Sequence, residues 1–152
     1  MTRQILATSG GFLPRVNSGG ARPGGLIKRA LELTGVERPR ITLVMTASGD
    51  DPGYLSLMYS SLVELNCVIY HLALFPMPNH ATEEIISKSD VIWVGGGPVV
   101  SVVGVPLWGY VRRSRRCVMF VVLSHVFDSD VHGVSAVFPG RGFQCSVGLG
   151  QC

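Results

Sequence analysis

The stretch Asp90–Val100, DVIWVGGGPVV, places an apolar run directly before three consecutive glycines. Such a run is typical of a strand that is buried on both faces of a parallel sheet. Gly95, Gly96 and Gly97 can bring backbone N–H groups close to a ligand, because glycine leaves room and adopts positive φ values. N–H groups of this kind bind phosphate or an oxyanion, but an ordinary tight turn explains the same glycines. The stretch therefore predicts a buried strand that ends in a glycine turn, and it leaves open what the turn holds.

The chain before this stretch alternates β-rich apolar runs with helical periodicity. Strands are predicted at Gln4–Thr8, Arg40–Ala47, Cys67–Phe75 and Asp90–Val94, and helices at Leu26–Gly35, Tyr54–Asn66 and Thr82–Ser89, with Thr82 as a cap. Ser9–Gly25, rich in glycine, proline and serine, is predicted to be a loop. Strands separated by helices of about ten residues indicate βαβ units with right-handed crossovers. We therefore expect one α/β domain, residues 1–152, built on a doubly wound, mostly parallel sheet with helices on both faces.

Three predicted loops meet at the carboxyl edge of such a sheet, where ligands bind in open α/β folds. They are Ser9–Gly11, Ser48–Asp51 and Gly95–Gly97. Asp50 and Asp51 could bind substrate, but capping of the next helix or turn formation is the more common use of aspartate there. His71 lies in a predicted strand and is interpreted as a packed residue.

The pattern changes after Gly97. Residues 98–152 contain no amphipathic helix and are rich in valine, glycine, serine and arginine. Gly133–Ala136 reproduces most of a G-x-S-x-G nucleophile elbow around Ser135, but Val137 replaces the second glycine. An ordinary loop serine is the alternative. His125 and His132 precede Ser135, and no histidine follows it, so the residues alone assign no catalytic base.

The composition argues against several classes of partner. Charged residues make up 15% of the chain and the net charge is +3, much of it in the run Arg112–Arg116. That run has no aromatic interleaving, so no nucleic-acid partner is expected. No apolar run reaches the ~18 residues of a membrane helix, and the N-terminus resembles no signal peptide. We therefore expect a cytoplasmic protein without a membrane partner.

The cysteines give no sign of a metal or another cofactor. Cys67, Cys117, Cys145 and Cys152 show no CxxC motif and no metal-ligand spacing. Cys67 and Cys117 are interpreted as small buried hydrophobic residues. No cofactor and no metal are expected, and the sequence carries no signal for an oligomeric state.

Four segments in the first 97 residues form a specific series: Ile5–Phe12 (ILATSGGF), Leu26–Asn66 with its TASGDD, His71–Phe75 (HLALF) and Asp90–Gly97 (DVIWVGGG). In this order and spacing they resemble the peptidase E family. These are serine peptidases related to aspartyl dipeptidases and cyanophycinases, and their fold is similar to that of class I glutamine amidotransferases, a flavodoxin-like arrangement. The resemblance covers residues 5–97.

The resemblance implies a serine nucleophile on a later strand–helix elbow and an oxyanion hole. Backbone N–H groups of Gly95–Gly97 would stabilise the oxyanion of a peptide carbonyl. If Ser135 is the nucleophile, the amide of Ala136 would be the partner donor. The implied substrate is a small peptide with an N-terminal aspartate.

The chain departs from this family after the glycine run. The family continues with a polar residue and a leucine-rich helix, where this chain has Pro98 and several valines. The family's elbow falls near Ser129, before the Ser135 match, and its histidine and orienting acid lie further downstream. Two explanations are open: the reading frame shifts near codon 98, or residues 98–152 have genuinely diverged. Both predict an incomplete or irregular C-terminal part.

Three functions are compatible with these observations. The first is a peptidase E-like serine hydrolase for small acidic peptides of the Asp-X type. The second is a truncated, non-catalytic pseudoenzyme or fragment of such a peptidase. The third is a small-molecule or amidotransferase-like binding domain, although none of the cysteines stands in the G-x-C-x-G elbow that an amidotransferase would need.

Overall fold

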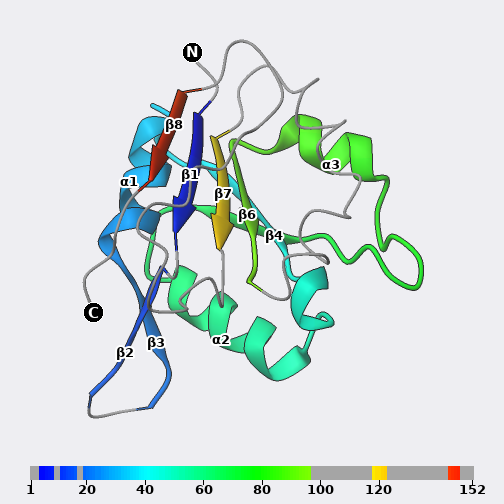
Figure 1. Ribbon diagram of the computed structural model, residues 1–152, viewed down its shortest axis with the longest axis horizontal. Helices are drawn as coiled ribbons and strands as arrows, with labels where there is room; N and C mark the ends of the chain where they lie inside the picture. Colours follow the sequence, from blue (N-terminus) through cyan, green and yellow to red (C-terminus); the bar gives the residue numbers. More distant parts are fainter. Residues whose placement is uncertain (1–3, 9–10, 17–18, 97–117, 123–143, 148–152) are drawn as a thin grey trace, which may run out of the picture.

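Figure 1 shows a computed structural model of the chain, which describes residues 4–8, 11–16, 19–96, 118–122 and 144–147. In these residues, six strands form one sheet in the order β5-β4-β6-β7-β1-β8, and two further strands form the hairpin β2–β3. The elements are β1 (Gln4–Thr8), β2 (Phe12–Pro14), β3 (Ala21–Pro23), α1 (Gly25–Leu33), β4 (Arg40–Val44), the 3₁₀ helix η1 (Thr46–Ser48), α2 (Pro52–Leu62), β5 (Val68–His71), α3 (Thr82–Lys88), β6 (Val91–Val94), β7 (Val118–Val122) and β8 (Gln144–Val147).

Every neighbouring pair in the six-stranded sheet is parallel. On β4, Leu43 is in register with His71 of β5 and with Trp93 of β6. The predicted mixed α/β architecture with a parallel sheet and three helices is therefore confirmed in the described part of the chain. Because the strands run in one direction, the loops after β4, β5 and β6 leave the sheet at the same edge.

Both faces of β4 are buried from Ile41 to Val44, which explains why this part of its sequence is apolar except for Thr42. On one face, Leu43 and Met45 belong to a core cluster that includes Ile27 of α1 and Met58 of α2. On the other face, the hydroxyl of Thr42 lies 2.7 Å from that of Ser89, at the end of α3. Helices thus pack against β4 from opposite sides.

Several predicted boundaries are corrected by backbone hydrogen bonds. The strand predicted to reach Ala47 ends at Val44, because the carbonyl of Met45 accepts from the amides of Ser48 and Asp50 and turns the chain into η1. The strand predicted at Cys67–Phe75 is shorter, since β5 ends at His71.

Side-chain contacts explain where β5 ends, and the start of α3 differs from the prediction. The side chain of Asn79 binds the Ala73 amide at 3.1 Å and the His71 carbonyl at 3.1 Å, which closes the loop after β5. Thr82 does not cap α3. The N-cap residue is Ala81, which makes no side-chain capping bond.

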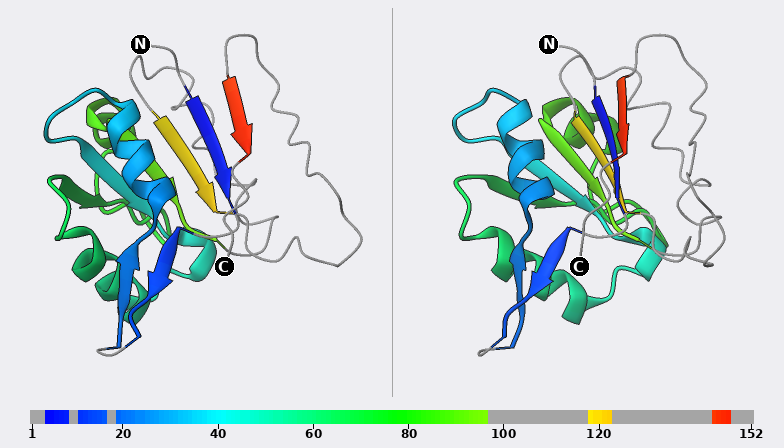
Figure 2. Two further views of the ribbon diagram at one scale, coloured as in Figure 1. Left: turned by 90° about the vertical axis from the view of Figure 1, so that its left-hand side faces the viewer. Right: turned by 60° about the vertical axis from the view of Figure 1, so that its left-hand side comes forward.

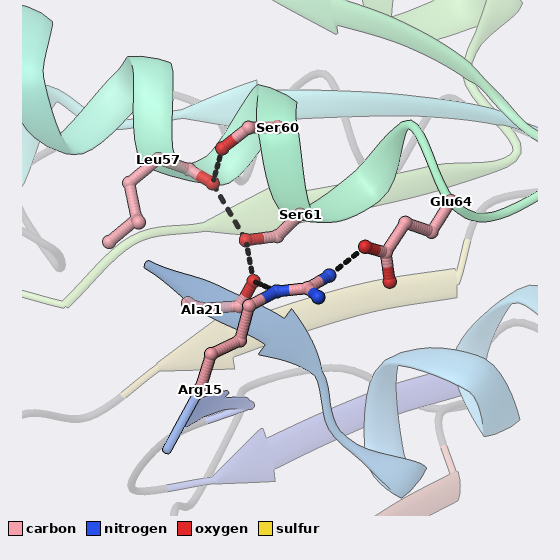
Figure 3. Close-up of polar contacts among 6 residues, drawn as sticks. All are labelled: Arg15, Ala21, Leu57, Ser60, Ser61 and Glu64. Carbon is pink, nitrogen blue, oxygen red and sulfur yellow. Dashed lines mark hydrogen bonds and ion pairs between the residues drawn. The ribbon is translucent and has the colours of Figure 1, made fainter. Parts of the chain in front are cut away.

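The segment Ser9–Gly25, predicted to be a loop, contains the β2–β3 hairpin instead. Figure 2 shows this hairpin projecting away from the sheet. It is tied to α2 through the Ala21 carbonyl, which accepts from Arg15 Nε at 3.2 Å and from Ser61 Oγ at 2.9 Å. Arg15 also forms an ion pair with Glu64 (Figure 3). Side-chain contacts with residues in and after α2 therefore stabilise the hairpin. The glycine, proline and serine content of the segment predicted only a loop.

The C-terminal part, predicted to be irregular, contributes two strands to the sheet. β7 lies between β6 and β1, and β8 lies beside β1 at the sheet edge. Neither strand was predicted, although Val118–Val122 is a continuous apolar run of the kind that forms buried parallel strands. In the described residues, β7 is the element that joins β1 to the β6 side of the sheet.

Candidate functional site

The glycine turn begins where β6 ends, and its first glycine has a packing role. The Gly95 amide donates to the Val44 carbonyl at 2.8 Å, continuing the pairing with β4. A Cβ atom at Gly95 would lie 2.7 Å from both Sδ and Cε of Met45, which is fully buried. Gly95 does not adopt a positive φ. Close approach of the Met45 side chain, and not backbone freedom, is therefore what favours glycine at this position.

Of the other two glycines of the turn, Gly96 is among the described residues and Gly97 is not. Gly96 is half-buried at the sheet edge, directly after the Gly95 amide that pairs with β4. Gly97 lies outside the described residues, as do Ser9 and Gly10 of the loop after β1. Since the Gly95 amide is already paired within the sheet, any donors that this turn offers to a ligand come from Gly96 and Gly97.

The loop after β1 packs against β6. A Cβ atom at Gly11 would lie 2.3 Å from Cη2 of Trp93, and the Gly11 carbonyl accepts from the Gly24 amide at 2.7 Å. The ring of Phe12 meets the Trp93 indole edge-on, with the centroids 5.3 Å apart. The TSGG and VIWVGGG motifs therefore contact each other in the folded chain.

The loop after β4 is a compact turn around one carbonyl oxygen. The Met45 carbonyl accepts from the Ser48 amide at 2.9 Å, the Asp50 amide at 3.1 Å and the Ser48 hydroxyl at 2.8 Å. Gly49 and Asp50 follow with φ values of 71° and 52°. A non-glycine residue in this left-handed region is uncommon, and aspartate is among the residues that tolerate it best.

Asp51 caps α2, as its sequence context predicted. Its Oδ1 accepts from the Tyr54 amide at 2.7 Å, and Pro52 is the first helical residue. This is a usual N-terminal arrangement, since the aspartate satisfies an amide that the helix leaves unpaired. The carboxylate of Asp51 thus has a structural role.

Asp50 makes a different contact, which the sequence analysis missed. Its Oδ1 lies 2.9 Å from Nε2 of His71, and both side chains are only 16% exposed. His71, interpreted from sequence as a packed strand residue, is therefore half of a histidine–carboxylate pair. His71 is the last residue of β5, and Asp50 lies in the loop that follows the neighbouring strand β4. A predicted position near the carboxyl edge of the sheet was the signal that the sequence offered for both residues.

Gly95 and Gly96 are the predicted site residues that the structure describes. Gly97, Ser135 and Ala136 lie outside the described residues, as do His125, His132 and Ser129. Their assignments stay predictions. The structure does place the loop after β1 against β6, through Gly11 and Trp93, and the glycine turn after β6 against the loop after β4, through Gly95 and Met45.

The described residues contain no group of three or more His, Cys, Asp or Glu side chains that could hold a metal ion. Cys67 is a half-buried free thiol packed against the core. Burial raises its pKa, and the charge of Arg38 lowers it in part. Because the thiolate is the nucleophilic form, a raised pKa makes this thiol a poor nucleophile. Among the helices of the described residues, none has the length and apolar character needed to cross a bilayer.

Comparisons with known proteins agree with the motifs at this edge. The family model described as peptidase family S51 matches residues 8–103, more than half of the chain. Over 61 residues the chain is 43% identical to the uncharacterized peptidase YgaJ of Bacillus subtilis (strain 168). That alignment covers 40% of this chain and 26% of the relative, so the chain matches about a quarter of the relative's length. No solved structure gives a significant match. The resemblance to the peptidase E family is thus supported over this segment, and the chain belongs to peptidase family S51.

Proposed function

We propose that the chain is a peptidase E-like serine hydrolase that cleaves small acidic peptides of the Asp-X type. The observation that carries this proposal is the contact between Gly95 and Met45, which sets the glycine turn beside the turn that follows β4. A glycine turn at the carboxyl edge of a parallel sheet is a suitable place to bind a substrate carbonyl. Membership of a peptidase family supports the reaction class.

The proposed fold is a doubly wound sheet like that of class I glutamine amidotransferases. Two observations support it. Ile27 of α1 and Met58 of α2 share one core cluster with alternate residues of β4, whereas Ser89, after α3, contacts Thr42 on the opposite face. Helices on both faces of a parallel sheet are what right-handed crossovers produce.

The proposed chemistry is acyl transfer to a serine. Ser135 attacks the scissile carbonyl, a base removes the serine proton, and the amides of Gly96, Gly97 and Ala136 stabilise the tetrahedral oxyanion. The Gly95 amide plays no part, because it donates to the Val44 carbonyl. We propose no cofactor, a cytoplasmic location and a small peptide as the partner.

A fluorophosphonate probe tests the nucleophile, because it labels activated serines covalently. The full chain should be labelled stoichiometrically and should hydrolyse an aspartyl-leucine dipeptide, and Ser135→Ala should abolish both. Ser124→Ala is the comparison variant, because Ser124 follows β7 by two residues in the sequence and β7 pairs with β6. If Ser124→Ala and not Ser135→Ala abolishes labelling, the assignment of Ser135 is wrong.

A non-catalytic chain is the second candidate, and one observation favours it. The family match ends at residue 103, before Ser135 and before any catalytic histidine that the family would provide. Without a complete triad the hydrolytic rate should be very low, since the members of a triad act as a unit. Absence of both labelling and hydrolysis would support this candidate. Reading the coding DNA after codon 97 in the other two frames tests the cause of such inactivity. A leucine-rich helix and a complete G-x-S-A-G elbow in one of those frames would explain why this chain lacks a complete triad.

A further inference from the structure

One hydroxyl at the carboxyl edge of the sheet stands out by its surroundings. Thr46 Oγ1 is buried and makes no hydrogen bond within the described part of the chain. Thr42, four residues earlier, shows the usual situation, since its buried hydroxyl lies 2.7 Å from that of Ser89. Buried polar groups without a partner are uncommon because they lose hydration without compensation. The Thr46 hydroxyl therefore requires an explanation.

Thr46 lies at the edge of the sheet where ligands bind in open α/β folds. Val44 of β4 is in register with Val94 of β6, and the Gly95 amide donates to the Val44 carbonyl. Thr46 follows β4 by two residues, as Gly96 follows β6, and neighbouring strands are only about 4.8 Å apart. Thr46 thus leaves the sheet beside the glycine turn, at the edge where parallel sheets bind ligands.

The turn that presents Thr46 is held by several independent contacts. The Met45 carbonyl binds the amides of Ser48 and Asp50 together with the Ser48 hydroxyl. Asp50 in turn is paired with His71. A segment restrained in this way presents its side chains in fixed positions, which is the arrangement that binding sites use.

We propose that Thr46 is a substrate-contacting residue whose hydroxyl donates a hydrogen bond to a carboxylate oxygen of the peptide held at the glycine turn. The inference rests on the proposed peptidase function for its ligand, but it requires binding only and no turnover. A carboxylate is the ligand group that we propose because its oxygens can accept from the Thr46 hydroxyl and from the neighbouring backbone amides at the same time. Small acidic peptides carry carboxylates at the side chain and at the C-terminus.

Three variants of the full chain test this inference. Thr46→Val removes the hydroxyl at nearly constant volume, Thr46→Ser keeps it, and Thr42→Val removes a paired hydroxyl from β4, the strand that precedes Thr46. Each is measured for its melting temperature and for the Kd of an aspartyl-leucine dipeptide by calorimetry.

Thr46→Val should weaken binding about tenfold or more, the usual effect of losing a hydrogen bond to a charged group, with an unchanged or higher melting temperature. Thr46→Ser should bind like the unmodified chain. Thr42→Val should lower the melting temperature and leave Kd unchanged.

Three results would overturn the inference. If Thr46→Val lowers the melting temperature as much as Thr42→Val does, the hydroxyl has a partner within the protein. If Thr46→Val leaves Kd unchanged, the hydroxyl does not contact the peptide. If the unmodified chain does not bind the dipeptide, Thr46 has no such ligand. Binding without hydrolysis contradicts the proposed catalysis and leaves the role of Thr46 in place.

Discussion

Gly11 lies against the indole of Trp93 so closely that a Cβ atom on Gly11 would stand 2.3 Å from Cη2 of the ring. Trp93 is 2% exposed and also packs against Phe12, so it has little room to move. The contact joins the loop after β1 to the strand that leads into the glycine turn. Two motifs at opposite ends of the family match are thus in direct contact.

Gly11→Ala should therefore destabilise the chain. The added methyl group forces the Trp93 ring out of its place in the core, and overpacking of this kind costs about 1–3 kcal/mol. Urea denaturation followed by fluorescence measures the loss. Gly25→Ala is the matched control, because a Cβ atom there meets nothing within 4 Å. That change lies in α1 and should be neutral or stabilising by about 0.5–1 kcal/mol. Equal effects of the two substitutions would contradict the packing argument.

Gly95→Ala should destabilise the chain through Met45. The new methyl group would meet the buried thioether at 2.7 Å, and the cost should be about 1–3 kcal/mol. A double-mutant cycle with Met45→Ala isolates this contact, since shortening Met45 creates room for the methyl group. We expect Gly95→Ala to cost clearly less in the Met45→Ala background. Strict additivity of the two unfolding free energies would show that another neighbour makes glycine necessary here.

The Asp50–His71 pair should contribute measurably to stability because both side chains are largely buried. Asparagine, like aspartate, tolerates the left-handed backbone at position 50. Asp50→Asn therefore removes the charge without straining the backbone, and it is the variant to use for measuring the pair. In a cycle with His71→Gln, the coupling energy at neutral pH should fall in the range of about 0.5–3 kcal/mol. Asp50→Ala should cost more than Asp50→Asn, since alanine adopts a positive φ less readily. A coupling energy of zero would mean that the two side chains are neighbours without an energetic interaction.

Ser61→Ala should loosen the β2–β3 hairpin. Ser61 Oγ lies 2.9 Å from the Ala21 carbonyl and 2.7 Å from the Leu57 carbonyl of its own helix, so its one proton is shared between them (Figure 3). Losing a hydrogen bond of this kind typically costs about 0.5–1.5 kcal/mol. Hydrogen exchange of the hairpin amides should accelerate. Ser60→Ala is the control, because the exposed Ser60 hydroxyl binds only the Leu57 carbonyl of its own helix. The same exchange rates in both variants would exclude Ser61 as the anchor of the hairpin.

Much of the architecture follows from local sequence. The continuous apolar runs at β4 and β6 predict strands that are buried on both faces, and the structure confirms this because helices pack on each side of β4. The Asp51–Pro52 start of α2 is also a local signal, since capping depends on residues within one turn. Contacts close in sequence are the ones that composition and periodicity reveal.

The ends of strands, the β2–β3 hairpin and side-chain pairs such as Asp50–His71 depend on contacts between residues that are distant in the sequence. The sequence analysis did not predict these features. The end of β4 depends on how the chain turns around the Met45 carbonyl, and the hairpin depends on Ser61 of α2 and on Glu64, which follows the helix. The pairing of Asp50 with His71 requires β4 and β5 to be neighbours, which the alternation of strands and helices does not specify.

The sequence by itself determined the family, the parallel α/β class and the glycine turn after β6, because these depend on motifs and on periodicity. Only the tertiary structure decided why the turn begins with glycine, which residue Asp50 binds and which threonine of the β4 segment has a partner. These properties depend on the distance between a strand end and its neighbours in the sheet: 2.7 Å from Met45 to a Cβ at Gly95, and 2.9 Å from Asp50 to His71. Distances of this kind arise only when strands far apart in the chain are brought into register.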